Sequence, residues 1–501
     1  MKILLVNPSR SYYQGSKGIR VGLPLGLLYL AAILEKNSYR PKIFDCLTSP
    51  QSKVIVEDDK ITHGLPDDII LETIKKEDPR VVGITNPFTA QIENAIHIAD
   101  LVKQVDKRII TVIGGPHVSV QSQELLKENK SIDIGVWGEG EYTFLELIKK
   151  IDKELPINDI ANITYRDETR GVIKNKSKGF IKNLDELVYP AYHLIDLEKY
   201  FDLLKRGLAP RPTIRQRSIS MITSRGCPYN CIFCSIHLHM GKFFRAHSPD
   251  YVIHHIKYVV DKYRVKHISF EDDNLTFDID RCKKILKGII DNQIKITWDT
   301  PNGVRADRID EELIILMKKS GCVELIFGIE SGSQRVLDEI VDKKLKLDKV
   351  IKVVQLCQKY KIKTKAFFVI GFPGETKKDI LKTKEFALKL YKKYKVESGL
   401  LIATPLVGTR LYQICKTKGY LIREPDSESL SIATQFYGQG LIRTPEFDPE
   451  YLKKVALETS KAQARIRLKE KLLKPRTYWS IFKFVVLHPG RTIKHLRKKI
   501  L

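Results

Sequence analysis

Three cysteines lie close together in the stretch RGCPYNCIFC, which runs from Arg225 to Cys234. Cys227, Cys231 and Cys234 have a C-x3-C-x2-C spacing, whereas the other five of the eight cysteines are scattered along the chain. Thiolates on a short loop bind soft metals. Structural zinc sites usually have four protein ligands, often as two C-x2-C pairs, and this sequence has no second pair. Three thiolates on a four-iron cluster would leave one iron without a protein ligand, so the triplet predicts a reactive cluster. A zinc loop or three structural cysteines is the alternative.

The sequence has two series of alternating strand and helix patterns, one before this loop and one that contains it. The first predicts a doubly wound parallel α/β sheet, a Rossmann-like (flavodoxin-like) domain over residues 1–151, with strands expected at 2–7, 41–46, 80–85, 108–115 and 132–138. Residues 152–217 lose this rhythm, and we interpret them as a connector with a hairpin around DETRG. Six strand–helix units over 218–442 then predict a partial parallel (β/α)6 TIM-type barrel. The cysteines follow its first strand, and parallel barrels hold reactive groups at the carboxyl ends of their strands.

The net charge of +26 is uneven, because residues 451–501 carry 15 Lys and Arg against two Glu. We predict a basic helical C-terminal extension over residues 443–501, with an aromatic cluster at Tyr478, Trp479, Phe482 and Phe484. Three interpretations stay open: a cap on the barrel, a peripheral membrane contact, or nucleic-acid binding, of which the last is the least favoured. No apolar run is long enough to span a membrane and no cleavable leader is recognised, so we expect a cytoplasmic protein, at most peripheral at the inner membrane face.

The stretch RGCPYNCIFC, with an aromatic residue before its last cysteine, resembles the signature of the radical S-adenosylmethionine (SAM) superfamily. The resemblance implies a 4Fe-4S cluster on Cys227, Cys231 and Cys234. It also implies that SAM chelates the open iron, and that one electron from the cluster cleaves SAM to a 5′-deoxyadenosyl radical. A one-electron reductant such as flavodoxin or ferredoxin is the implied partner.

Other strand ends of the predicted barrel resemble segments with which this family binds SAM. FEDDN ends the second strand, where Glu271, Asp272 and Asp273 are expected to accept hydrogen bonds from the SAM amino group; a helix cap is the alternative. In GIESGSQRVL and VIGFPGET, Glu330 and Ser331 are expected at the methionine or ribose, and Gly371 at the adenine. We also expect Glu375 to cap the following helix and Arg305 to pair with the SAM carboxylate.

A Rossmann-like sheet before such a barrel resembles the cobalamin-binding subfamily, as do NPSR, GGPHVS and GEGEYTF in the first 151 residues. Thr85, Gly114 and Gly115 are the expected cobalamin contacts, because only glycine lets the backbone approach a flat corrin closely. The D-x-H-x-x-G loop that supplies a cobalt ligand in some cobalamin domains is missing, so the resemblance implies cobalamin without a protein histidine ligand. A domain that has lost cobalamin is the alternative, and His117 is interpreted as a local hydrogen-bonding residue.

These features together predict a cobalamin-dependent radical SAM enzyme, most simply a methyltransferase acting on an unactivated carbon of a small-molecule or lipid-like substrate. Three alternatives stay open. The first is a cyclase or rearrangement enzyme without methyl transfer, and the second is an RNA-modifying radical SAM enzyme. The third is a non-catalytic cobalamin carrier, which would need no SAM cluster. No catalytic residue beyond the cofactor contacts can be named from the sequence.

Overall fold

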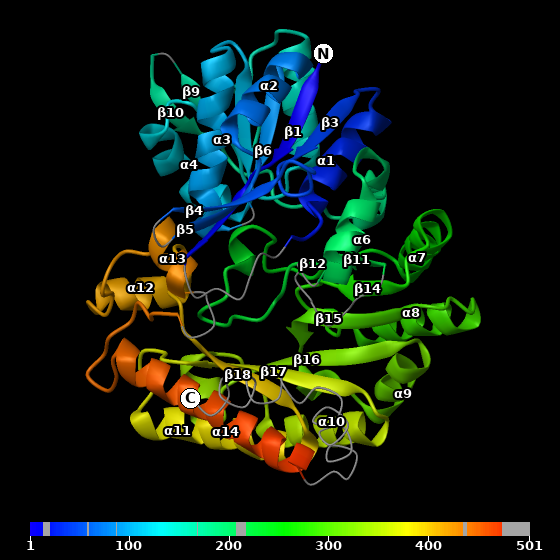
Figure 1. The fold of residues 1–501 in the computed structure, drawn as a ribbon, viewed down its shortest axis with the longest axis vertical. Helices are drawn as coiled ribbons and strands as arrows, with labels where there is room; N and C mark the ends of the chain where they lie inside the picture. The colour runs from blue at the N-terminus through cyan, green and yellow to red at the C-terminus, as the bar shows by residue number, and fades with distance from the viewer. Residues whose placement is uncertain are drawn as a thin grey trace, which may run out of the picture.

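The structure is a computed structural model that describes residues 1–13, 21–57, 60–86, 88–167, 169–206, 217–433 and 438–472. Figure 1 shows two α/β units stacked along the long axis, with the N-terminal sheet above the sheet of the second unit. The predicted order of a Rossmann-like domain, a partial parallel barrel and a C-terminal helix is confirmed.

The N-terminal sheet has all five expected parallel strands, in the order β8-β7-β6-β1-β3. Apart from the edge strand β3, its strands are largely buried, as expected for a sheet covered on both faces. They are β1 (Ile3–Asn7), β3 (Pro41–Asp45), β6 (Val81–Thr85), β7 (Ile110–Gly114) and β8 (Ile134–Val136). Helices α1 (Leu25–Lys36) and α5 (Glu141–Asp152) pack in one apolar core, and α2 (Asp67–Glu77), α3 (Ile92–Val105) and α4 (Pro116–Glu128) in the other.

The stretch predicted as a connector begins with the expected hairpin. Strands β9 (Ile163–Asp167) and β10 (Gly171–Lys174) pair antiparallel and extend the N-terminal sheet beyond β8. Helix α6 (Leu197–Arg206) follows and lies between the two units (Figure 1). The sheet of the first unit therefore continues past residue 151.

A small antiparallel sheet beside the N-terminal unit has no counterpart in the sequence-based interpretation. It consists of β2 (Arg10–Tyr13), β5 (Lys60–Gly64) and β4 (Lys53–Glu57), in the order β2-β5-β4. Strand β2 contacts α13 (Ser427–Ala433), so this sheet links the N-terminal unit to the segment after the barrel.

The second unit is the predicted six-stranded parallel sheet, in the order β11-β14-β15-β16-β17-β18. Its strands are β11 (Ser218–Met221), β14 (His267–Phe270), β15 (Thr297–Val304), β16 (Cys322–Glu330), β17 (Lys363–Ile370) and β18 (Glu397–Ile402). Its outer helices are α7 (Pro249–Tyr263), α8 (Ile279–Asp291), α9 (Glu311–Lys319), α10 (Leu347–Lys359), α11 (Lys377–Tyr394) and α12 (Arg410–Thr417). Within the described residues β18 does not pair with β11, so the barrel is open.

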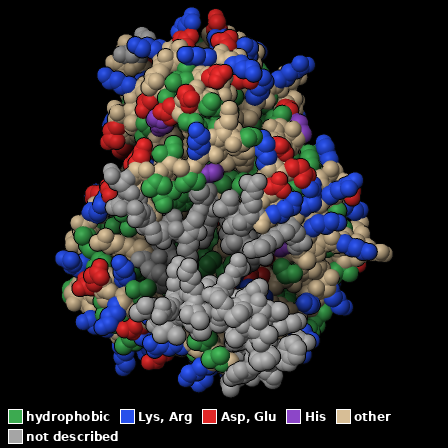
Figure 2. Space-filling model, in the orientation of Figure 1, with side chains coloured by type: hydrophobic (Ala, Val, Ile, Leu, Met, Phe, Trp, Pro, Cys, Tyr) green, Lys and Arg blue, Asp and Glu red, His purple; other side chains and the backbone are tan. Residues whose placement is uncertain are grey.

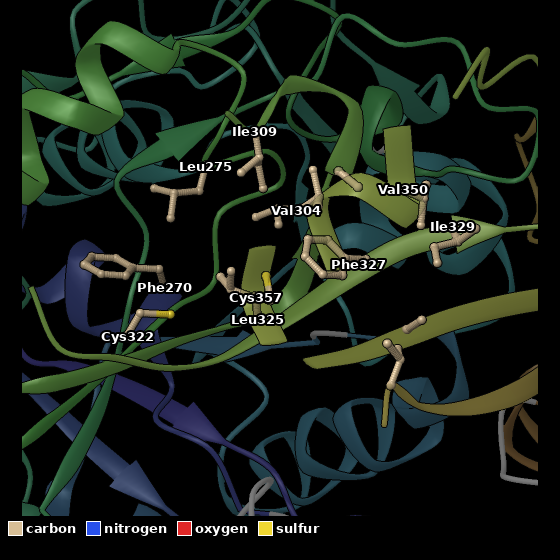
Figure 3. Packing of buried hydrophobic residues seen from close by; sticks show 14 of the residues in the cluster. Phe270, Leu275, Val304, Ile309, Cys322, Leu325, Phe327, Ile329, Val350 and Cys357 are labelled. Atoms are coloured by element: carbon tan, nitrogen blue, oxygen red, sulfur yellow. The ribbon is translucent and has the colours of Figure 1, made fainter. Parts of the chain in front are cut away.

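The barrel is held together by one large apolar core. Phe270, Val304 and Phe327 come from three neighbouring strands, and Figure 3 shows them with Leu325 and Ile329 among the labelled side chains. This core fixes the strands, and with them the loops at the strands' carboxyl ends.

Helix α14 (Pro449–Leu472) packs against α11 and β18, as Figure 1 shows, with Leu452 and Val455 in the core. Residues 473–501, with the aromatic cluster, lie outside the described residues. None of the helices described is both long and apolar enough to cross a membrane. Lysine and arginine side chains are spread over the visible face and interspersed with acidic ones (Figure 2).

Candidate cofactor-binding site

The cysteine loop starts at a short antiparallel pair, β12 (Ser224–Arg225) with β13 (Arg245–Ala246), at the carboxyl end of β11. Gly226 has φ +78°, and a Cβ there would lie 2.4 Å from the carbonyl oxygen of Phe243. The backbone N–H of Gly226 donates to Oδ2 of Asp273, at 2.9 Å. The chain therefore turns sharply into the first cysteine, and the segment after β14 anchors this turn.

All three thiols of the loop are half-buried and unoxidised. Burial raises the pKa of each, and that of Cys234 to about 12, so the thiols are protonated at neutral pH unless a metal displaces the proton. Within the described residues, no three His, Cys, Asp or Glu side chains lie close enough to hold one metal ion. Three thiols on one loop are a donor set that suits a four-iron cluster, in which one iron then has no protein ligand.

The three predicted acidic residues after β14 occupy different environments. Asp272 is buried and accepts from the hydroxyls of Thr223 (2.7 Å) and Ser224 (2.5 Å), while its Oδ2 has no hydrogen-bond partner among the described residues. Burial raises the pKa of Asp273 to about 7. Glu271 accepts a 2.6 Å hydrogen bond from Ser220. Asp272 therefore fixes Thr223 and Ser224, directly before the cysteine loop. The expected contacts of Glu271, Asp272 and Asp273 with SAM remain predictions.

Asn274, which ends the FEDDN segment, is a further buried residue that the sequence did not single out. Its Nδ2 lies 3.9 Å from Sγ of Cys227, within the range of a hydrogen bond to sulfur. Hydrogen bonds to cluster sulfurs tune the reduction potential of such centres.

Behind Cys231 lies a buried pair between Lys343 and Glu330, with Nζ and Oε1 2.9 Å apart. Burial raises the pKa of Cys231, while the charges of Lys343 and Arg305 act in the opposite direction. Glu330 has φ +71°, an uncommon conformation for a residue with a side chain. Lys343 was not recognised in the sequence, because nothing in its neighbourhood relates it to Glu330.

The guanidinium of Arg305, the predicted partner of the SAM carboxylate, already has several contacts. It donates to both carboxylate oxygens of Asp307 (3.1 and 2.8 Å) and to the carbonyl of Lys343 (2.9 Å). It also lies 3.8 Å from the centre of the Tyr229 ring, in the cysteine loop. Arg305 therefore links β15, the segment after β16 and the cysteine loop, and its contact with SAM remains a prediction.

Ser331, expected at the SAM methionine or ribose, is fully buried at the end of β16. Its hydroxyl lies 3.0 Å from that of Thr383 in α11 and accepts from the backbone of Ser333. The hydroxyl thus joins β16 to α11, and its predicted contact with SAM remains a prediction.

The expectation that Glu375 caps the following helix is wrong. Thr376 is the N-cap of α11 and forms a capping box with Asp379. The carboxylate of Glu375 instead turns back and accepts from the backbone N–H groups of Gly371 (2.7 Å) and Phe372 (2.8 Å). Burial raises its pKa to about 7. Glu375 therefore fixes the backbone at Gly371, the predicted adenine contact.

The predicted cobalamin contacts lie together at the carboxyl edge of the N-terminal sheet, where Thr85 of β6 pairs with Gly114 of β7. Gly115 has φ +136°, and a Cβ there would lie 2.0 Å from the carbonyl oxygen of Asn86. At Gly114 the nearest atom to an added Cβ is 3.5 Å away. The protein's own packing explains Gly115, whereas an added Cβ at Gly114 would make only ordinary contacts with Val136, so the packing does not require glycine there.

His117 is buried near this edge, and its Nδ1 lies 3.2 Å from the hydroxyl of Thr89. Burial lowers its pKa to about 4, so the imidazole is neutral at physiological pH. This geometry agrees with the interpretation of His117 as a local hydrogen-bonding residue.

A buried charge network joins the two units directly before the cysteine loop. Arg225 donates to Glu139 (2.9 Å) and Glu141 (2.6 Å), and Arg245 also donates to Glu139. The Arg225 guanidinium lies 5.5 Å from the centre of the Tyr29 ring in α1. Burial alone would raise the pKa of Glu141, but Arg225 lowers it. The GEGEYTF stretch was noticed in the sequence, but its function as this anchor was not.

A cavity of about 590 Å³ opens beside the cysteine loop, against Pro228, Tyr229 and Asn230. Cations outnumber carboxylates on its walls: Arg305, Arg308, Lys343, Lys344 and Lys349 against Asp307 and Asp342. Asp307 is paired with Arg305, and Asp342 with Lys344 and Arg410. The cavity is therefore electropositive and suits an anionic partner.

Two family models match the chain. Residues 221–387 match the radical SAM superfamily, and residues 20–148 match the B12 binding domain. The two matches coincide with the two α/β units, and the radical SAM match contains the cysteine loop.

Several proteins of known name are similar over most of the chain. The chain is 30% identical to the cytidylyl-2-hydroxyethylphosphonate methyltransferase of Streptomyces wedmorensis, over 89% of this chain and 86% of that protein. It is 33% identical to an uncharacterized methyltransferase of Pyrococcus horikoshii, over 84% of each. The anaerobic magnesium-protoporphyrin IX monomethyl ester cyclase of Rubrivivax gelatinosus is 27% identical, over 77% of this chain and 65% of that protein.

Two solved structures share the fold. The methyltransferase TsrM from Kitasatospora setae, with cobalamin and a 4Fe-4S cluster bound, gives a TM-score of 0.65 at 18% identity and covers 85% of this chain and 79% of its own. The cobalamin-dependent enzyme OxsB, with aqua-cobalamin and SAM bound, gives 0.67 at 17% identity and covers 97% of this chain and 71% of its own.

Proposed function

Because the chain belongs to the radical SAM superfamily and carries the B12 binding domain, we propose that it methylates an unactivated carbon of a small organic substrate. The chain is a radical SAM enzyme, and its cofactors are a 4Fe-4S cluster, SAM and cobalamin. Methylation is supported by the names of two relatives that share at least 30% of aligned residues with this chain. One observation carries the proposal: the cysteine loop and the edge at Gly114 belong to units that the Arg225 network joins.

Cys227, Cys231 and Cys234 are the proposed cluster ligands. The bound cluster supplies the single electron that cleaves SAM reductively. The turn at Gly226, anchored by Asp273, positions the loop, and the charges of Lys343 and Arg305 lower the pKa of Cys231 against the effect of burial. Asp273 and Glu330 are the proposed acceptors for the SAM ammonium group, and Glu375 presents the backbone at Gly371 to the adenine. The protein thereby orients SAM against an iron that has no protein ligand.

At the N-terminal sheet edge, Thr85 and the backbone at Gly114 are the proposed contacts of the cobalamin nucleotide tail. Gly115 keeps the turn after β7 in the required conformation. His117, whose Nδ1 lies 3.2 Å from the Thr89 hydroxyl, is proposed as a local hydrogen-bonding residue, with cobalamin held without a protein histidine ligand. Bound cobalamin would serve as the methyl carrier between SAM and substrate.

The basic cavity beside Tyr229 is the proposed docking site of an acidic one-electron donor such as flavodoxin or ferredoxin. Its wall includes the three residues between the first two cysteines, so a donor bound there lies next to the cluster loop. Complementary charge steers such encounters and speeds association more than it strengthens binding.

The test is anaerobic reconstitution with iron, sulfide and hydroxocobalamin, followed by incubation with reductant and SAM labelled in its methyl group. Cytidylyl-2-hydroxyethylphosphonate is the first substrate to try, because a relative that aligns over 89% of this chain at 30% identity is named for it. We expect label in the product together with 5′-deoxyadenosine. Cys231→Ser should retain corrin but lose the cluster and both products.

Each other outcome points to a different reaction. A product without label, formed together with 5′-deoxyadenosine, would favour rearrangement or cyclisation, as in the relative named a cyclase. Activity that survives in Cys231→Ser, or zinc in place of iron in the wild-type protein, would refute the proposed role of the triplet.

A further inference from the structure

Strand β4 is the free edge of the small sheet β2-β5-β4 and carries apolar side chains. Among the strands that the structure describes it pairs only with β5, and all five of its residues are exposed. Val54, Ile55 and Val56 are 52%, 37% and 61% exposed. Exposed edge strands offer unpaired N–H and C=O groups to other chains, and proteins usually protect them with charge, proline or a covering element. In the described part of the chain, the middle of the strand has no such protection.

The two ends of β4 carry opposite charges, Lys53 and Glu57. Within the described residues, neither forms an ion pair in its own chain, although the neighbouring Lys60 pairs with Glu93 at 3.3 Å. Both charges therefore remain available to a partner that lies along the edge.

The order of residues in β4, KVIVE, is self-complementary in an antiparallel arrangement. If two copies of the strand pair about Ile55, Lys53 of each lies opposite Glu57 of the other. Val54 then lies opposite Val56, and the two Ile55 side chains meet on the symmetry axis. Opposite charges and β-branched pairs directly across an antiparallel ladder are stabilising. A shift of two residues would lose both ion pairs and place a charged residue opposite Ile55.

We propose that β4 joins two copies of this chain into a symmetric dimer by antiparallel β4–β4 pairing centred on Ile55. Such an interface is isologous, because the same patch is used by both copies. The second copy is the occupant because the strand complements its own charge pattern. A five-residue strand gives a contact smaller than a standard interface, so the dimer should depend on protein concentration.

The first experiment measures the mass of the full-length reconstituted protein in solution by light scattering over a range of concentrations. We expect the mass to rise from the 57.6 kDa of one chain to twice that value. Val56→Lys should keep the protein monomeric at every concentration. Val323→Lys changes a valine that is 41% exposed on β16 and should dimerise like the wild type. A wild-type monomer at all concentrations, or a dimer that persists in Val56→Lys, would overturn the proposal.

A second experiment tests the register independently of dimer strength. Ile55→Cys should form a disulfide-linked dimer under mild oxidation, because the two cysteines face each other on the axis. Val54→Cys alone should cross-link poorly, because the two Val54 residues of a dimer lie diagonally across the ladder, too far apart for a disulfide. A mixture of Val54→Cys and Val56→Cys should link well. The wild type gives the background from the native cysteines, and equal cross-linking of Ile55→Cys and Val54→Cys would contradict the register.

Discussion

Replacement of Glu141 by Gln would remove one of the two carboxylates that face Arg225 between the two units. Arg225, Glu139 and Glu141 are all buried, and Glu139 is shared with Arg245. The variant therefore has two buried cations for one carboxylate. Removal of one partner from a buried pair costs about 3–5 kcal/mol, and the Gln oxygen can still accept a hydrogen bond. We expect the free energy of unfolding to fall by about 3 kcal/mol.

The measurement is anaerobic urea unfolding of the whole chain, followed by tryptophan fluorescence, since Trp137 lies two residues before Glu139. Glu146→Gln is the matched control on the same helix. Its partner Lys178 is 3.2 Å away and both side chains are exposed, so the expected loss is below about 1 kcal/mol. Equal losses in the two variants would refute the idea that the Arg225 pairs hold the units together.

Three further predictions concern the cofactor-binding residues and the basic cavity. Gly115→Ala should lower the free energy of unfolding by at least about 2 kcal/mol because of the contact with Asn86. Gly114→Ala should unfold like the wild type but retain less cobalamin after desalting. Equal cobalamin retention in Gly114→Ala and the wild type would contradict the proposed contact. Burial raises the pKa of Glu375 from 4.5 to about 7, so the folded state binds a proton that the unfolded state has released between these values. The stability that this proton provides is lost as pH rises through about 7. The free energy of unfolding of the wild type, measured with urea, should therefore fall between about pH 5 and 8 by roughly 2 kcal/mol more than that of Glu375→Gln. Parallel curves would contradict this. Lys344→Glu combined with Lys349→Glu should slow cluster reduction by flavodoxin several-fold while dithionite reduces both proteins equally, and unchanged flavodoxin rates would exclude this docking site.

The fold was largely predictable, because the strands of both parallel sheets are apolar runs with a local signal. Val81–Thr85 and Ile110–Gly114 lie within the ranges expected from the sequence. The small sheet was missed although β4 and β5 are separated by only two residues. Strand β4 is exposed on both faces, so it has no alternation of buried and polar residues to indicate a strand.

The candidate site was predictable only where chemistry depends on local spacing. The cysteine triplet is such a case, and its place after β11 agrees with the structure. The pairs of Arg225 with Glu139 and Glu141 join residues more than 80 positions apart, and no local pattern relates them. The cap of α11 was misassigned by one residue, since Glu375 and Thr376 are both plausible from the sequence and only tertiary packing turns Glu375 inward.

The Arg225 network also limits how this enzyme can be engineered. The arginine comes from the barrel unit and its carboxylates from the N-terminal unit, so the two halves are not interchangeable modules. A chimera that combines this barrel with a foreign cobalamin domain would bury an unpaired guanidinium beside the cysteine loop unless the new domain carries both acids. Recombination between relatives should therefore tolerate only those crossovers that transfer Glu139 and Glu141 together with Arg225.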